Sequence, residues 1–236
     1  MHYKHYTSAV LTGIVLLFVV LSFTARCDAA GPTEKSVYSS HVNAQNKIAL
    51  TFDDGPHPRY TPEILDILRE FNIHATFFLI GENAERYPEL VERIQREGHE
   101  IGNHTYGHAN LQTVEECLIQ KEIERAENSI LLIADQRPKL LRPPGGLYDE
   151  RVCRAALDLE YDIILWNIDT LDWAHTPSKA IVDNVLTNVQ CGDIILCHDF
   201  IGGDPSPTPE ALRILIPDLL ARNFDFATVS ELIHCN

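Results

Sequence analysis

Residues 47–56, KIALTFDDGP, decide the fold of this chain. After Lys47 the next five residues are apolar or β-branched, which is typical of a short strand. Two acids, Asp53 and Asp54, and a Gly–Pro turn follow directly. Strands that are apolar on both faces belong to parallel sheets covered by helices. We therefore expect these acids at the edge of such a sheet.

Outward from this stretch, strands and helices alternate along the chain. We predict strands over 47–52, 75–80, 100–103, 140–142, 161–168, 193–197 and 224–229, and helices over 61–72, 88–97, 113–134, 149–159, 178–189 and 209–222. Single helices between strands imply parallel pairing with helical crossovers. Seven strands, and a length slightly below the ~250 residues of an eight-fold barrel, predict a single-domain α/β fold, a distorted (β/α)7 barrel. An open Rossmann sheet is disfavoured because no GxGxxG follows the first strand.

The composition argues against two classes of protein. Of the 236 residues, 34 are Asp or Glu and 19 are Lys or Arg, which gives a formal net charge of −15. Phosphate contacts need a basic face, so this balance argues against a nucleic-acid partner. Hydrophobic residues make up 45% of the chain and charged residues 22%, which is too apolar a balance for a disordered protein.

The amino-terminal segment has the pattern of an export signal. Residues 10–23 form an uncharged apolar run behind Lys4, and small residues follow near Ala29. The run is shorter than the ~20 residues of a membrane-spanning helix, so we predict a signal peptide over 1–29. An uncleaved amino-terminal membrane anchor is the alternative. We expect the protein to be secreted or extracytoplasmic, and to contact a membrane only through that anchor.

Residues with catalytic chemistry stand at the ends of five predicted strands. They are Asp53 and Asp54, His104 and His108, Arg142, Asp169, and His198. In a parallel barrel the carboxyl-terminal strand ends meet on one face, where such barrels hold their active sites. Packing could explain any one of these residues but not all five strand ends together. The sequence therefore predicts one site built from all five.

The segment HTYGH, residues 104–108, predicts a metal site. One helical turn would align His104 and His108 on one face, and an adjacent carboxylate would complete a two-histidine, one-carboxylate set. Three protein ligands leave an open position, as in catalytic zinc sites, and non-haem iron uses the same ligands. Of the two acids in DDGP, one could bind the metal while the other acts as a general base on water.

Five motifs in this chain resemble those of the polysaccharide deacetylases of carbohydrate esterase family four. They are TFDDGP at 51–56, HTYGH at 104–108, RPPGG at 142–146, DTLDW at 169–173 and ILCHD at 195–199, in the order of the family. The resemblance extends over residues 47–233. KIALTFDDGPHP and the final VSELI are most similar to bacterial members that act on peptidoglycan, chitooligosaccharide or related glycans.

The resemblance implies a role for each matching polar residue. Asp53 would be the general base, held and oriented by Arg142. His198 would be the general acid, and Asp169 would tune it. Three residues would bind a divalent metal ion, with zinc expected: Asp54, His104 and His108.

The resemblance also implies a substrate pocket. Trp173 and Leu196 would line it around the acetyl methyl group, and the backbone N–H of Gly145 would help to hold the oxyanion. Many family members carry an aromatic residue where this chain has Gly145. The N–H is kept here, but one wall of the substrate groove is lost.

We therefore predict a deacetylase domain over 47–236, behind an extension over 30–46. The predicted reaction is metal-dependent removal of N-acetyl groups from a cell-wall glycan, of the peptidoglycan N-acetylglucosamine type. N-Acetylmuramic acid, chitooligosaccharide or chitin, and acetylated xylan are alternative substrates.

A catalytically silent glycan-binding domain is the alternative of another class, disfavoured by the complete acid, base and metal set. A metal-dependent phosphoesterase is a weaker third alternative, because such an enzyme would usually need two metal ions. The expected partner is the N-acetylated polysaccharide, bound by a monomer.

Overall fold

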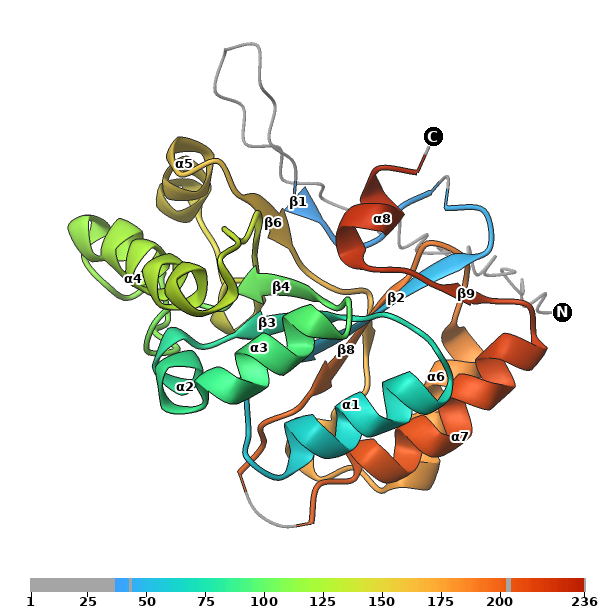
Figure 1. Ribbon diagram of the computed structural model, residues 1–236. Coiled ribbons are helices and arrows are strands. Elements are labelled where there is room, and N and C mark those ends of the chain that lie inside the picture. Colours follow the sequence, from blue (N-terminus) through green and yellow to red (C-terminus); the bar gives the residue numbers. More distant parts are fainter. Residues whose placement is uncertain (1–36, 43, 203–204, 236) are drawn as a thin grey trace, which may run out of the picture.

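A curled sheet of parallel strands forms the centre of the molecule (Figure 1). The computed structural model describes residues 37–42, 44–202 and 205–235, so the predicted leader over 1–29 lies outside the described residues. The strands pair in the order β1-β6-β5-β4-β3-β2-β8-β7, with β9 beside the start of β2. Their bounds are β1 (Val37–Tyr38), β2 (Lys47–Asp53), β3 (Thr76–Leu79), β4 (Glu100–Asn103), β5 (Leu140–Leu141), β6 (Asp162–Ile164), β7 (Ile168–Asp169), β8 (Ile194–His198) and β9 (Asp225–Phe226).

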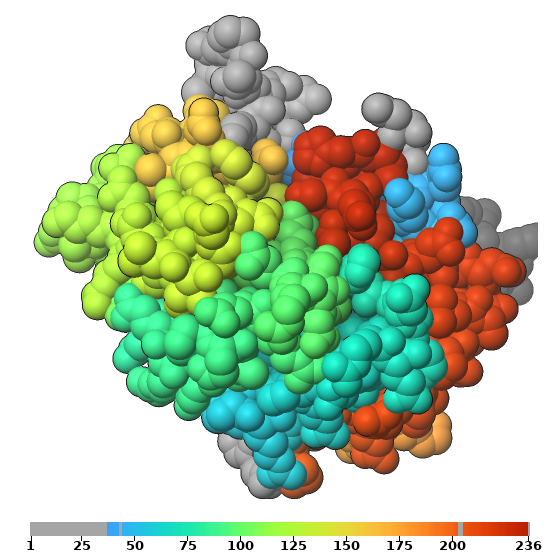
Figure 2. Space-filling model, in the orientation of Figure 1, coloured from blue at the N-terminus to red at the C-terminus, as the bar shows by residue number. Residues whose placement is uncertain are grey.

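Helices cover the outside of this sheet. They are α1 (Tyr60–Glu70), α2 (Gly81–Arg86), α3 (Pro88–Arg96), α4 (Glu116–Ala134), α5 (Glu150–Asp158), α6 (Ser178–Asn188), α7 (Thr208–Ala221) and α8 (Val229–Ile233), with two 3₁₀ turns, η1 (Pro144–Gly146) and η2 (Asp172–Ala174). Figure 2 shows the helices side by side over the face that Figure 1 presents. Within the described residues, no helix is both long and apolar enough to cross a membrane. The predicted single-domain α/β fold, a distorted (β/α)7 barrel, is confirmed.

Alternate residues of each strand face opposite sides of the sheet, and this alternation places the site. On β2, Ile48, Leu50 and Phe52 pack outward in the main apolar cluster with residues of α1, α6 and α7. Ala49 belongs to a second cluster inside the barrel, which residues of α8 close at the amino-terminal ends of the strands. By the same alternation Asp53 faces inward at the opposite, carboxyl-terminal end.

The predicted strand over 161–168 is two strands in the structure. Its first part, β6, pairs with β5 and β1, and its last part, β7, pairs with β8. One segment therefore supplies the edge strand β7 and, at the other side of the sheet, the strand β6 next to the edge strand β1. Between them the side chain of Asn167 accepts the backbone N–H of Ile194 at 2.9 Å, so a side chain replaces a ladder hydrogen bond where the strand is interrupted.

Two short helices were not predicted. The helix α8 begins at a capping box, in which Thr228 and Glu231 satisfy each other's backbone N–H groups. The helix α2 has six residues and begins with Gly81, so it is too short for an apolar period to reveal it. It lies beside α4, and both helices flank the segment that carries the two predicted metal-binding histidines.

Candidate active site

The strand register brings the predicted residues to one end of the sheet. Asp53 is the last residue of β2, and it pairs with Phe78 of β3 and with His198, the last residue of β8. His104 and Arg142 directly follow β4 and β5. Four of the five consecutive strands from β5 to β8 in the sheet order therefore present these side chains at their carboxyl-terminal ends.

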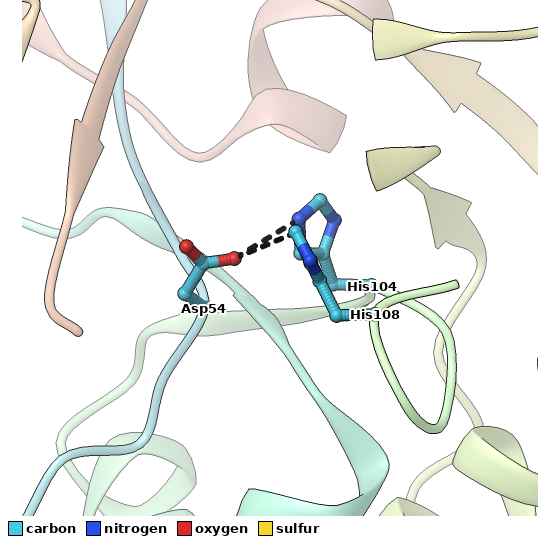
Figure 3. A group of neighbouring side chains, drawn as sticks. All are labelled: Asp54, His104 and His108. Atoms are coloured by element: carbon cyan, nitrogen blue, oxygen red, sulfur yellow. Dashed lines mark ion pairs between the residues drawn. The ribbon is translucent and has the colours of Figure 1, made fainter. Parts of the chain in front are cut away.

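Asp54, His104 and His108 point toward one another (Figure 3). The Oδ1 atom of Asp54 lies 3.3 Å from Nε2 of His104 and 3.2 Å from Nε2 of His108. Burial raises the pKa of Asp54, but the two imidazoles outweigh burial and hold that pKa well below its usual range. The same contact raises the pKa of His108.

These three residues fit a divalent metal ion. The Oδ1 atom of Asp54 is buried and accepts no hydrogen bond from the described residues, although two imidazole nitrogens face it. Two atoms that bind one tetrahedral zinc ion at about 2.0 Å are separated by about 3.3 Å. The distances from this oxygen to the two nitrogens, 3.3 and 3.2 Å, match that separation. The donor set suits zinc or non-haem iron.

The HTYGH segment reaches this arrangement without the helical turn that we expected. Thr105 and His108 have φ angles of 65° and 56°, in the left-handed region, and the chain turns so that both rings meet Asp54. The Nδ1 atom of His104 donates to the carbonyl oxygen of Arg142 at 2.7 Å. The Nε2 atom of His104 therefore keeps its lone pair on the side of Asp54.

Arg142 fixes the orientation of Asp53. It is fully buried, and its Nη1 atom donates to Asp53 Oδ1 at 2.7 Å and to Thr51 Oγ1 at 2.8 Å. Its Nε and Nη2 atoms donate to two backbone carbonyls of the segment that leads from β6 to β7. Because Arg142 holds Oδ1, the Oδ2 atom of Asp53 lies on the side of His104, 3.8 Å from Nε2.

The carboxylate that contacts His198 belongs to Asp172. The Nδ1 atom of His198 donates to Asp172 Oδ1 at 2.7 Å, and the backbone N–H of His198 donates to Oδ2 at 2.8 Å. Asp169 instead accepts the backbone N–H of Leu171 at 2.8 Å. The prediction that Asp169 tunes His198 is therefore wrong. Leu171 has a left-handed φ of 56°, and this turn starts η2 and carries Asp172 to His198.

Asp172 keeps His198 protonated. Burial lowers the pKa of His198, but the hydrogen bond and charge of Asp172, together with the charges of Asp53 and Asp54, raise it to about 9. Asp172 is completely buried and also accepts hydrogen bonds from the Trp173 backbone and a threonine hydroxyl. The imidazole is thus a cation at neutral pH. DTLDW contains Asp172 as its second acid, but the motif does not indicate which of its two acids reaches His198.

A cavity of about 260 Å³ opens beside the metal-binding residues. Its lining comes from five segments and comprises Asp54, Ile80, Asn83, His108, Trp173, Phe200, Ile201 and Gly202. Trp173 lies in this wall and is 53% exposed. Leu196 is buried on β8 and is not one of these lining residues. Gly145 is exposed on η1, with a φ of 64°.

A further buried acid packs against the turn that follows β2. Asp199 accepts a hydrogen bond from the Thr61 hydroxyl at 2.5 Å, and burial raises its pKa to about 7. A Cβ atom on Gly55 would lie 2.2 Å from this carboxyl group. The close approach of Asp199 therefore requires glycine in the DDGP motif.

Known proteins with this arrangement identify the family. The model of the family described as polysaccharide deacetylase matches residues 41–164. A peptidoglycan-N-acetylglucosamine deacetylase of Bacillus cereus is 42% identical over 186 residues, which cover 79% of this chain and 68% of that protein. A chitooligosaccharide deacetylase of Bradyrhizobium sp. is 34% identical over 204 residues, which cover 81% of this chain and 92% of that protein.

A solved structure extends this similarity to three dimensions. The crystal structure of a peptidoglycan N-acetylglucosamine deacetylase superposes with a TM-score of 0.80 and 39% identity, over 85% of this chain and 94% of that one. The chain therefore belongs to the polysaccharide deacetylases, carbohydrate esterase family four, which are hydrolases of carbon–nitrogen bonds other than peptide bonds.

Proposed function

We propose that this protein is a metal-dependent deacetylase that removes N-acetyl groups from peptidoglycan N-acetylglucosamine. The observation that carries the proposal is the division of two adjacent acids. Asp54 faces two imidazoles, whereas Asp53 faces a buried guanidinium. One carboxylate is thereby suited to hold a metal ion, and its neighbour is kept apart to accept a proton.

Asp53 acts as the general base. A divalent ion held by Asp54, His104 and His108 would lower the pKa of water and polarise the acetyl carbonyl. Arg142 binds Oδ1 of Asp53 at 2.7 Å, so Oδ2 is the oxygen that takes the proton from the attacking water. The buried ion pair fixes the direction of that oxygen.

His198 acts as the general acid. An amide nitrogen leaves only if it is protonated, and His198 holds a proton at neutral pH because of Asp172. Its Nδ1 is committed to Asp172, so Nε2 delivers the proton to the departing sugar nitrogen. Asp53 and His198 are paired across two adjacent strands, so base and acid approach the same carbonyl carbon.

Other residues of this end shape the substrate pocket. The exposed ring of Trp173 would cover one side of the sugar or of its acetyl group. The backbone N–H of Gly145 would donate to the oxyanion. Leu196 is buried, so it would support the wall of the pocket without lining its surface. We further propose that the protein is exported and works outside the cytoplasm, as residues 1–29 predict.

The decisive experiment measures acetate release. The purified protein is incubated with intact peptidoglycan, N-acetylglucosamine oligomers and acetylated xylan, with added zinc and with a chelator. We expect zinc-dependent release, fastest from peptidoglycan. Release from the oligomers alone would assign a chitooligosaccharide deacetylase instead. No release from any substrate would favour a silent glycan-binding domain.

A substitution at His104 tests the assignment of the metal-binding residues. In His104→Ala one of the two nitrogen ligands is lost, so we expect zinc content and acetate release to fall together. His234 is exposed and lies far along the chain, so His234→Ala is the matched control and should retain zinc. Full zinc occupancy in His104→Ala would refute this ligand set.

A further inference from the structure

Residues 80–83, which we call the α2 bracket, contact both segments that carry the metal-binding residues. The bracket comprises the last residue before α2 and the first three residues of that helix. One of the two segments is the DDG turn, residues 53–55, and the other is HTYGH, residues 104–108. The two segments are about fifty residues apart in sequence, so a shared support can fix the distance between their side chains.

The bracket holds the backbone of the DDG turn by two hydrogen bonds. The Nδ2 atom of Asn83 donates to the carbonyl oxygen of Asp54 at 2.8 Å. The backbone N–H of Ile80 donates to the carbonyl oxygen of Gly55 at 3.0 Å. Asp54 has a φ of 74°, in the left-handed region that residues other than glycine rarely adopt. An external contact that holds this carbonyl also holds the strained residue in place.

The bracket holds HTYGH in the same way. The backbone N–H groups of Gly81 and Glu82 donate to the carbonyl oxygens of Thr105 and Tyr106, each at 3.0 Å. These are first-turn N–H groups of a helix, which have no partner within the helix itself. Thr105 is left-handed, like Asp54. Both ligand-bearing segments thus contain a residue of unfavourable conformation, and both are tied to the same turn of helix.

Close packing fixes the bracket itself. A Cβ atom on Gly81 would lie 2.8 Å from the Cα atom of Ala126 in α4 and 2.8 Å from Cδ2 of Tyr106. Glycine therefore lets α2 sit directly against α4 and the HTYGH segment. A bracket seated on a nineteen-residue helix cannot follow small movements of either ligand segment.

We propose that Asn83 is a positioning residue for the metal site, acting through the Asp54 carbonyl to keep the Asp54 carboxylate opposite the two imidazoles. The proposal rests on the proposed function, because it takes Asp54, His104 and His108 to be the metal ligands. Asn83 donates to Asp54 through its side chain, whereas the other described hydrogen bonds from the bracket to these segments come from backbone N–H groups, so substitution can remove the side-chain bond and leave the backbone bonds in place.

The test measures zinc affinity of the full chain by competition with a chromophoric chelator. In Asn83→Ala the amide donor is lost, and we expect zinc to bind about 10- to 100-fold more weakly, as for other supports of metal ligands. Asn83→Asp places a carboxylate oxygen against the Asp54 carbonyl and should weaken binding further. Excess zinc should restore acetate release to Asn83→Ala but not to Asp54→Ala.

Asn188→Ala is the matched control, because Asn188 also donates to a backbone carbonyl at 2.8 Å but is exposed on α6. Its zinc affinity should equal that of wild type. Zinc affinity within twofold of wild type in both Asn83 variants would overturn the proposal. So would an Asn83→Ala protein that is unfolded without zinc, since the bond would then serve folding. If the wild type itself binds no zinc, the proposed function fails instead.

Discussion

The two ends of the barrel each bury a histidine, with opposite results. At the carboxyl-terminal ends of the strands, His198 is 9% exposed and its pKa is raised to about 9. At the amino-terminal ends, His99 is 7% exposed and its pKa is lowered to about 4. Burial opposes the charge of both rings. Asp172 accepts a hydrogen bond from Nδ1 of His198 at 2.7 Å. Around His99, His74 and Arg93 add to the effect of burial, and the carboxylate of Glu97 offsets it only in part.

The comparison of His198 with His99 shows what the carboxyl-terminal end of the barrel, which we call the active end, requires in addition to strand ends that lie close together. A charge is kept inside this barrel only where a buried partner compensates for lost solvent. Asp53 has Arg142, and His198 has Asp172. No carboxylate among the described residues bonds to the ring of His99, the charge of Glu97 is outweighed, and the ring stays neutral. The following changes remove a partner or a charge at one end and leave the other end intact.

The largest expected effect is the loss of the base at the active end. Asp53→Asn preserves the shape of the side chain but cannot accept a proton from water. We expect acetate release to fall by ~10²–10⁴-fold or more. Zinc content should stay at the wild-type level, because Asp53 is outside the set of three metal-binding residues. Acetate release and bound zinc are measured on the same preparation, and undiminished release would exclude Asp53 as the base.

The next effect separates His198 from its partner. In Asp172→Asn, His198 loses the charge of Asp172 and keeps only the charges of Asp53 and Asp54 against burial, so its pKa should fall well below about 9. We expect kcat/KM to fall by about 10²–10³-fold. The alkaline limb of its pH profile, which follows loss of the His198 proton, should move from near pH 9 to lower pH.

Asp169→Asn is the matched control for this variant. It alters an acid of the same DTLDW motif whose Oδ1 accepts only a local backbone N–H, that of Leu171. The alkaline limb should therefore stay near that of wild type. A limb that moves in Asp169→Asn and stays in Asp172→Asn would restore the assignment made from the sequence.

The active end was largely predictable, because strand position decides where a side chain goes. Asp53 and His198 end parallel strands, so any barrel built from those strands brings them together. Which of the two acids in DTLDW reaches His198 was not predictable. That choice depends on a left-handed φ of 56° at Leu171, and a leucine gives no signal for such a turn.

Contacts between distant segments were also beyond the sequence. The interruption between β6 and β7 depends on Asn167 bonding to Ile194 of another strand. The position of α2 depends on Gly81 lying against Ala126 and Tyr106. Local propensity and periodicity report on one segment at a time, so they cannot reveal a conformation that a neighbouring segment imposes.

The smallest expected effect lies at the amino-terminal end and concerns stability alone. His99 Nδ1 accepts the backbone N–H of Ala75 at 3.2 Å, so protonation of the ring would break this bond inside the core. Its pKa is about 4 in the folded protein and 6.5 in the unfolded chain. Between these values the unfolded chain binds the extra proton. Stability from this group is therefore full above pH 6.5 and is lost as the pH falls toward 4, by about 3 kcal/mol.

His99→Asn should flatten this dependence, since the Asn oxygen can replace Nδ1 as acceptor and does not titrate. The free energy of unfolding is measured in urea from pH 7 to 4 with a chelator present, because metal binding has a pH dependence of its own. Subtracting the His99→Asn curve from the wild-type curve removes the pH dependence that comes from the acids and from His198, because both proteins contain these groups. His234→Asn removes an exposed imidazole and should keep the wild-type slope. Equal slopes in wild type and His99→Asn would mean that His99 bears its charge in the folded protein, and the contrast between the two ends would then rest on His198 alone.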